Sequence, residues 1–445
     1  MVAGFAGCGW LFAADGTVAP PASETQLADA VALSSAAFAT DLYAQLHTRP
    51  GNLAFAPLGL MQALLPVAAG AGEGTHEEFV RALHLSVPVP EAADGLAALA
   101  RRLQDDAGGA DNLDFAYALW VRDSLALRPE YVDFLWQRSR SELRGADFGR
   151  SDVAAQWMNR WISDRTGGRI ARIADERILG PATCLVAGSA VYFEAEWLEG
   201  FDPQATAPAA FHRKPERAAA PAASLTAGTS QGALTTAEAE PARAAGADEK
   251  PVEVPMMHRV GALRLAALPG VRLVEIPFRG DRLAMVVALP AEGTPLAEVE
   301  AALVAGRLTE WMGAVKKAEL RQIDLQLPRF KAAEALPDLG AVLAAAGLRA
   351  AFDPGGAADF TLCGMDLAGA PLHLSGVTHR LKFSLTEHGA RAAATTATPA
   401  AEPQYDRPVE LPTSFQVNRP FLYWVGDRQS GCVLLLGRVV DPGLD

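Results

Sequence analysis

The spacing of hydrophobic and polar residues predicts amphipathic helices interspersed with long strands. Apolar residues recur at helical intervals over 27–46, and again over 153–166, directly before a Gly-Gly pair. Residues 182–197 form one continuous apolar run, which is typical of a strand buried on both faces. Apolar and polar residues alternate over 323–331, which indicates a strand with one face in the core.

The same pattern marks further elements, and together they predict a mixed α+β chain with several long, non-local strands. The expected elements are a short strand, a turn at Pro57 and a buried helix within 51–75, a strand over 111–123, two strands around 279–281, a helix over 337–352, a strand over 371–387, and two strands around a turn in 415–442. Gly70, Gly72 and Gly74 follow the buried helix. A phosphate-binding loop would follow a strand and open a helix, so we expect these glycines to end the helix instead.

Residues 212–250 differ in character from the rest of the chain. Ala, Pro, Thr and Gly dominate, and large hydrophobic residues are nearly absent, so the segment has nothing to bury. We expect a flexible insertion that interrupts one domain without dividing it, because strand patterns resume directly afterwards. That domain is expected over 27–442, with 1–26 as an N-terminal extension.

Composition narrows the functional classes. The chain has 445 residues, of which 50% are hydrophobic and 20% charged, so it can bury a large core. Its formal net charge of −13 argues against nucleic acid or an anionic membrane as a general partner. No apolar run reaches the ~20 residues of a membrane helix. The four cysteines form no C-x-x-C pair, and Cys184 and Cys432 lie in apolar runs, as small core residues do.

The first residues, MVAGFAGCGWLFAADG, are small and apolar but lack a basic start. They fit a plain extension, a shortened secretion signal, or a lipid-attachment site at Cys8. The expectation leans toward an extracellular or secreted protein, with the cytoplasm as the alternative.

A search for catalytic chemistry finds no assembled site. The chain contains no G-x-S-x-G, H-E-x-x-H or G-x-x-x-x-G-K-[ST] motif. His76 begins an H-E-E-F string without a second histidine, and the D-F-G triplet at Asp147 lacks a matching catalytic loop. His379 lies in an apolar strand, where a lone histidine is usually a hydrogen-bonded core residue. We therefore expect no enzyme activity, no metal site and no cofactor.

Seven strings resemble one protein family and occur in its order. They are NLAFAPLGLMQALL (52–65), MNRWISDRTGGRI (158–170), AVYFEAEW (190–197), VPMM (254–257), LPRF (327–330), VTHRLKFSLTEHG (377–389) and FQVNRPFLYWVGDRQSGCVLLLGRVVDP (415–442). Over about 27–442, excluding the insertion, the chain resembles the serpins. The resemblance implies an α+β serpin fold with three β-sheets, about eight or nine helices and an exposed reactive-centre loop.

By this resemblance, 387–412 is the hinge and reactive-centre loop. The hinge residues are Glu387, Gly389, Ala390, Ala392, Ala393, Ala394 and Thr396. In the family a protease cleaves this loop and is caught as an acyl-enzyme while the loop inserts as a new central strand. Such a loop can carry no large or charged side chain on its inward face, and alternate strand residues share a face. The even-numbered residues from 390 to 398 are all small, whereas Arg391 falls on the opposite face.

The resemblance also marks residues that control opening of the central sheet, namely Trp197, Ser189, Arg329 and His379. Arg329 is expected to pair with Glu387 beside Trp197. Near His379 the chain departs from the family, because Ala56 and Gly59 stand where two serines are usual and Ser189 where an asparagine is usual. The buried polar network there is expected to be smaller or to be rebuilt with water.

The resemblance leaves several candidates for the scissile bond. At the family's usual distance from the hinge the bond falls near Pro403, whose ring fixes φ and distorts a cleavage segment. The candidates are Ala401, Pro403, Gln404 and Tyr405. Ala401 suits an elastase- or subtilisin-like protease and Tyr405 a chymotrypsin-like one. Arg407 precedes a proline, which discourages trypsin-like cleavage.

Three functions follow as hypotheses. The first is an irreversible suicide-substrate inhibitor of serine or cysteine proteases, acting as a monomer. The second is a non-inhibitory serpin-fold protein that serves as a binding module or chaperone, which Pro399, Pro403 and the altered opening region support. The third, an enzyme, lacks a site to carry it. A covalent complex with a protease, a cleaved chain alone, or neither would distinguish the three on a denaturing gel.

Overall fold

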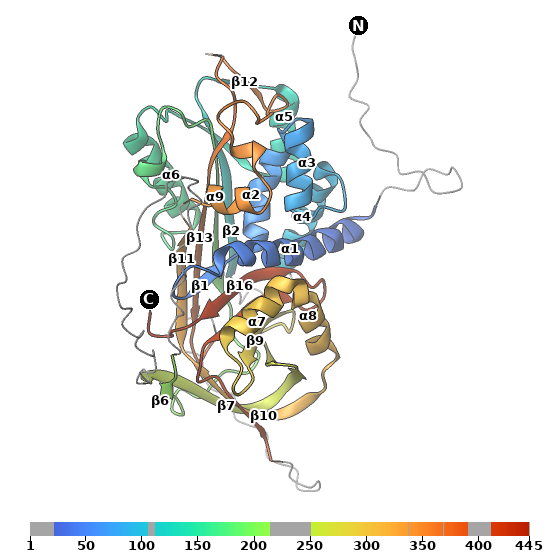
Figure 1. The fold of residues 1–445 in the computed structure, drawn as a ribbon, viewed down its shortest axis with the longest axis vertical. Helices are drawn as coiled ribbons and strands as arrows, with labels where there is room; N and C mark the ends of the chain where they lie inside the picture. Colours follow the sequence, from blue (N-terminus) through green and yellow to red (C-terminus); the bar gives the residue numbers. More distant parts are fainter. Residues whose placement is uncertain are drawn as a thin grey trace, which may run out of the picture.

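A computed structural model describes residues 22–105, 112–213, 251–336, 338–367, 369–389 and 411–444, and Figure 1 shows the arrangement of their helices and strands. The expectations for the N-terminal extension up to residue 21, for the insertion from residue 214 to 250 and for loop residues 390–410 lie outside these ranges.

A five-stranded sheet forms the centre of one half of the molecule (Figure 1). Its order is β4 (Glu142–Ala146), β2 (Asn112–Arg122), β5 (Leu185–Glu194), β13 (Leu374–Leu385) and β11 (Phe330–Leu336). β5 pairs antiparallel with β2, and β13 pairs antiparallel with β11. Between them, β13 runs parallel to β5 over nine residue pairs. The adjacent strands β5 and β13 therefore point the same way.

The other strands form two more sheets. The nine-stranded sheet contains β1 (Leu53–Phe55), β16 (Val433–Val439), β15 (Phe421–Asp427), β9 (Leu283–Pro290), β8 (Val271–Pro277), β7 (Val252–Leu268), β10 (Leu320–Pro328) and β14 (Thr413–Gln416) in that order, with β6 (Ala207–Phe211) paired to β7. A two-stranded sheet joins β3 (Leu125–Leu127) to β12 (Gly364–Asp366).

Nine α-helices lie in the described part of the chain. They are α1 (Glu24–Leu46), α2 (Pro57–Ala69), α3 (Glu73–Ala82), α4 (Val89–Asp105), α5 (Pro129–Phe134), α6 (Ser151–Arg165), α7 (Leu296–Ala302), α8 (Leu308–Lys317) and α9 (Gly340–Ala345). Short π-helical turns, η1 (Leu135–Ser139) and η3 (Leu303–Arg307), and 3₁₀ turns, η2 (Glu176–Ile178) and η4 (Ala350–Phe352), complete them. Three sheets with nine helices confirm the predicted α+β fold.

Helices cover both faces of the central sheet, which explains the unbroken apolar run of β5. Ala187 and Val191 belong to the main core, into which α2 packs. Val186 and Ala190 alternate with them and join a second cluster around Met158 of α6. Successive strand residues point to opposite faces, so a strand covered on both sides needs apolar residues throughout.

Local signals account for several element ends. Ser23 and Gln26 form a capping box at the start of α1. Gly70 ends α2 as predicted, whereas Gly72 and Gly74 lie at the start of α3, a helix that the glycine pattern did not predict. The helix expected over 337–352 is shorter, since α9 ends at Ala345. Gly347 follows with φ at +118°, a conformation that turns the chain out of the helix.

Candidate functional site

Two regions at the boundary between β5 and β13 contain the residues that the resemblance singled out. The first is the seam, where β5 and β13 pair from Leu185 and Leu374 to Phe193 and Phe383. The second is the hinge turn, Thr386–Gly389, which directly follows β13.

The hinge turn reverses the direction of the chain at the end of β13. The Thr386 amide donates to the Gly389 carbonyl at 2.7 Å, and the Gly389 amide donates to the Thr386 carbonyl at 3.0 Å. On its other side Gly389 bridges Glu196, which follows β5, in an antiparallel sense. Gly389 therefore lies between the continuation of β13 and the continuation of β5.

Position 389 requires glycine. Its φ is +117°, a region that residues with a Cβ rarely adopt. A Cβ there would lie 2.7 Å from both Glu196 Cα and Trp197 N, and closer still to the carbonyl oxygen of Ala195. The glycine lets the two backbones approach closely enough to pair.

Glu387 is held inside the turn by two donors. Its carboxylate is 3% exposed and accepts from Arg329 Nε at 2.7 Å, from the Nη2 of the same guanidinium, and from the Thr206 hydroxyl at 2.6 Å. Burial raises the pKa of Glu387, but the hydrogen bonds from Arg329 and Thr206 outweigh it, so the pKa is lowered from its ordinary value. The carboxylate is therefore ionised near neutral pH.

Trp197 attaches the hinge turn from the β5 side. Its indole Nε1 donates to the Thr386 carbonyl at 3.0 Å, and its backbone amide donates to the His388 carbonyl at 3.0 Å. The indole is buried and stacks on Phe278, with ring centroids 4.6 Å apart and planes 3° from parallel. The Phe201 amide adds a bond of 2.9 Å to the Glu387 carbonyl.

His379 occupies the middle of the seam and is fully buried. Its Nε2 accepts from the backbone amide of Ala56 at 3.0 Å, and its Nδ1 lies 2.7 Å from the hydroxyl of Ser189, its partner in β5. Burial, with a smaller effect from Arg380, lowers the pKa of His379 to about 3. The imidazole is therefore neutral, and since Nε2 accepts, the proton lies on Nδ1 and is donated to Ser189.

The residues that depart from the family pattern make this network small. Ala56 contributes only its backbone amide, a free donor at the start of α2, which His379 satisfies. Gly59 has no room for a side chain, because a Cβ there would lie 2.6 Å from Val191 Cγ2. On the opposite face, the buried Thr378 hydroxyl has no hydrogen-bond partner within the described residues. In the middle of the seam the strands are therefore held by backbone pairing, by packing and by the neutral bond between His379 and Ser189, and at its start the Cys184 amide donates to the Ser375 hydroxyl at 2.8 Å.

The predicted residues fall into two groups and a remainder. Trp197, Arg329, Glu387 and Gly389 meet at the hinge turn, whereas Ser189 and His379 meet in the seam. The remaining candidates lie outside the described residues, namely Ala390, Ala392, Ala393, Ala394, Thr396, Ala401, Pro403, Gln404 and Tyr405.

Sequence reasoning missed two side chains at the hinge turn, Thr206 and Phe278. Neither belongs to a recognisable motif, and Thr206 lies 181 residues from its partner Glu387. Within the described ranges, no group of three or more His, Cys, Asp and Glu side chains could hold a metal ion.

Comparison with known proteins identifies the family. The model of the serpin family, described as serine protease inhibitor, matches residues 33–221 and 242–442. An uncharacterized serpin-like protein of Thermococcus kodakarensis is 29% identical over 411 residues, which cover 91% of this chain and 84% of that protein. The leukocyte elastase inhibitor of Bos taurus is 28% identical over 414 residues, covering 91% and 97%. This chain therefore belongs to the serpin family.

The fold of the chain agrees with that assignment. The crystal structure of Serpin48, a highly specific serpin of the insect Tenebrio molitor, superposes with a TM-score of 0.74 at 21% identity, covering 93% of this chain and 98% of that one. A membrane-spanning helix is not found among the described residues.

Proposed function

We propose that this serpin is an irreversible suicide-substrate inhibitor of serine proteases and not an enzyme. The protease would be elastase-, subtilisin- or chymotrypsin-like, and one monomer would be consumed per protease. The cleaved loop would enter the seam as a new central strand and hold the protease as an acyl-enzyme.

The position of Gly389 is the observation that carries this proposal. It bridges Thr386 on one side and Glu196 on the other, so it already occupies the first position of a strand between β13 and β5. A strand that continues from Gly389 runs antiparallel to β13. Because β5 is parallel to β13, the same strand is antiparallel to β5 as well. Insertion would exchange one parallel pairing for two antiparallel pairings.

The chemistry of trapping needs no catalytic group from this chain. The protease serine attacks a carbonyl of the loop, the peptide C–N bond breaks, and the new amino terminus leaves with the C-terminal part. The ester between protease and loop persists if insertion outruns hydrolysis. New backbone hydrogen bonds, each worth about 1 kcal/mol net, together with apolar burial give insertion a driving force on the order of ten kcal/mol. The uncut fold would then be stable by rate and not by equilibrium.

The test is incubation with subtilisin, elastase and chymotrypsin, followed by a denaturing gel. The expected result is a covalent band at the summed mass of protease and inhibitor fragment, together with a raised melting temperature of the cleaved chain. A cleaved chain with neither effect would overturn the proposal and favour the non-inhibitory binding protein.

A pair of loop substitutions tests the inward face. Ala394→Arg places a charge on the face that must enter the sheet, and burying an unpaired charge costs several kcal/mol. Insertion should slow, and the number of inhibitor molecules consumed per protease should rise severalfold. Arg391→Ala, on the opposite face, should leave that number nearly unchanged. Equal effects of the two would contradict the alternating-face argument.

A further inference from the structure

A groove of about 970 Å³ runs beside β2, at the edge of the central sheet away from β13. Its walls combine apolar side chains, namely Phe115 and Tyr117 of β2, Val132 of α5, Trp136 of η1 and Leu143 of β4, with the charged residues Arg140, Glu142, Arg144 and Arg165. The Trp136 side chain is 82% exposed and Val132 is 38% exposed. Large apolar side chains at the wall of an open groove mark an interaction surface.

The backbone of β2 is also open at this groove. β4 pairs with β2 only from Ala118 to Arg122, so on that side no strand of the described chain pairs with 112–117. Unpaired strand edges accept an additional strand through main-chain hydrogen bonds, and neighbouring pockets accept its side chains. The groove therefore fits an extended segment that places apolar side chains against Val132, Trp136 and Leu143.

The start of α1 is linked to this groove through Arg101 of α4. Glu24 pairs with Arg101 of α4 at 3.3 Å, and Arg101 lines a cavity of about 150 Å³. That cavity and the groove share Phe115, Tyr117 and Arg140 as lining residues.

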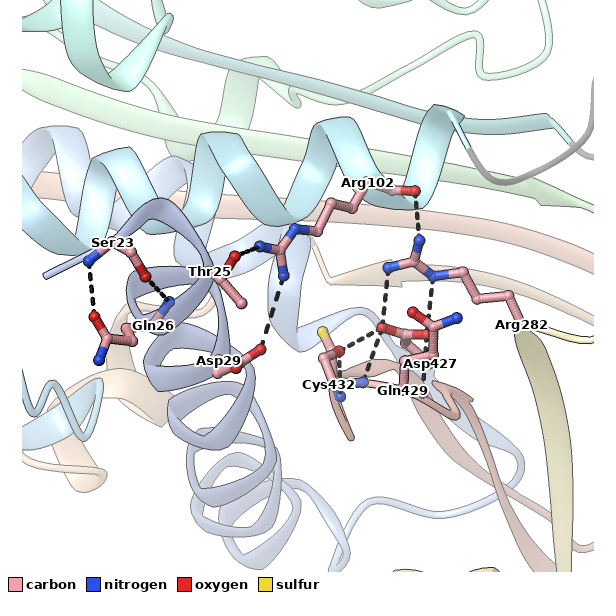
Figure 2. A network of polar contacts seen from close by, with 10 residues as sticks. Ser23, Thr25, Gln26, Asp29, Arg102, Arg282, Asp427, Gln429 and Cys432 are labelled. Atoms are coloured by element: carbon pink, nitrogen blue, oxygen red, sulfur yellow. Dashed lines mark hydrogen bonds and ion pairs between the residues drawn. The ribbon is translucent and has the colours of Figure 1, made fainter.

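Further contacts fix this end of α1. Figure 2 shows the capping box of Ser23 and Gln26, and Arg102 donating to the Thr25 hydroxyl at 2.7 Å.

The N-terminal segment is long compared with the distance it would have to cross. Fully extended, its 21 residues would span roughly 70 Å, several times the ~10–12 Å width of a helix such as α4. The segment 1–21 is therefore long enough to reach the groove.

The chemistry of this segment matches the groove. Residues 1–14 carry no charged side chain and include Phe5, Trp10, Leu11 and Phe12. In an extended conformation Cys8, Trp10 and Phe12 share one face, as alternate strand residues do. Such a segment can present two aromatic rings to an apolar wall while its backbone pairs with an open edge.

We propose that the N-terminal segment 1–21 docks in this groove and adds a strand to β2 beside β4. The docking does not depend on protease inhibition, so a negative result in the docking test would leave the proposed inhibition standing, and a negative gel assay would leave the proposed docking standing.

Disulfide trapping in the full chain tests the docking, with Cys8 as the probe. The other three cysteines are buried, so they do not compete. Val132→Cys puts a thiol at the groove, and Val260→Cys puts one on β7, where Val260 is 53% exposed. Figure 1 labels α5, which carries Val132, and β7 toward opposite ends of the molecule. At submicromolar protein in a glutathione buffer, the Cys8 disulfide should form at least tenfold faster with V132C than with V260C. Equal rates would overturn the proposal.

Two further full-length variants separate docking in the groove from chance encounter. Adding Trp136→Arg to V132C should lower the rate of disulfide formation to that of V260C, and an unchanged rate would contradict docking against Trp136.

Hydrogen exchange tests whether the docked segment pairs with β2 as a strand. Among residues 113–117, the amides that point away from β5 should exchange at least tenfold faster in a Trp10→Ser, Phe12→Ser double variant than in the wild type. Equal exchange would exclude strand addition.

Discussion

The hinge turn and the middle of the seam both join β5 to β13, but they do so by different means. At the hinge turn an ionised Glu387, a guanidinium that is 43% exposed and a set of backbone hydrogen bonds hold the chain. In the seam a single neutral histidine, fully buried, makes the side-chain bond across the strands. The hinge turn is charged and partly exposed, whereas the middle of the seam is neutral and fully buried.

In the proposed mechanism the two regions would have different roles. The hinge turn would determine where the loop begins to insert, and the seam would determine how easily β5 and β13 separate. Gly389 bridges Thr386 on one side and Glu196 on the other, so on the proposed mechanism the hinge turn would be the entry point. Parting of the strands in the middle of the seam would break the side-chain hydrogen bond between His379 and Ser189. That bond joins two neutral groups, and such a bond contributes about 1 kcal/mol net, so its loss would add only about that much to the cost of opening.

The largest expected effect comes from Gly389→Val. The side chain would meet the backbone of Glu196 and Trp197, and valine disfavours φ of +117°. We expect a loss on the order of 3 kcal/mol in stability, seen as a melting temperature several degrees lower at a fixed scan rate. Gly180→Ala is the control, because a Cβ there meets nothing within 4 Å. A G389V chain as stable as this control would show that the close approach is not needed.

The next effect is a dependence on pH from His379. Its folded pKa of about 3 lies below its ordinary value, so the unfolded chain binds a proton that the folded chain excludes. Stability should therefore fall as the pH drops below about 6.5, by about 2 kcal/mol at pH 5. His379→Gln keeps an acceptor for Ala56 but cannot titrate, so its pH profile should be flatter by that amount.

The control for His379 is the same substitution at exposed His212, which lies away from the seam. Its pH profile should match that of the wild type. If H379Q retains the full wild-type loss between pH 7 and pH 5, the buried histidine is not the source.

A smaller effect is expected from Glu387→Gln. The lowered pKa of Glu387 means that its stabilising contribution is complete near neutral pH and is lost as the pH falls through that lowered value. Since Arg329 is partly exposed, we expect a loss of about 1 kcal/mol at pH 7 that disappears in acid. Glu310→Gln, in the exposed pair with Arg307, should change little at any pH. A pH-independent loss in E387Q would point to packing instead of charge.

The smallest effect is expected from deleting part of the low-complexity segment 212–250, which tests whether that segment contributes to the stability of the domain. Deleting 214–245 removes few large hydrophobic side chains, so stability should change by less than about 0.5 kcal/mol. The pH profile that His379 produces should be unchanged. A loss of several kcal/mol would mean that the segment packs against the domain.

The sequence by itself determined the elements and the family. The spacing of apolar residues predicted α1, α6, β5 and β10. A helix or strand that buries one face or both faces shows a characteristic spacing of apolar residues in its own sequence, whichever elements it packs against. Motif strings placed Arg329 near Glu387, and the apolar strand around His379 marked it as a core histidine; the structure pairs Arg329 with Glu387 and buries His379.

Only the tertiary structure decided the contacts between residues far apart in the chain. The bond from Ala56 to His379 spans 323 residues, and Thr206 reaches Glu387 across 181. It also shortened α9, where the conformation of Gly347 ends the helix that the apolar pattern alone had extended. Local sequence encodes backbone preference and burial, but a buried donor takes whichever acceptor the packed sheets and helices bring within about 3 Å.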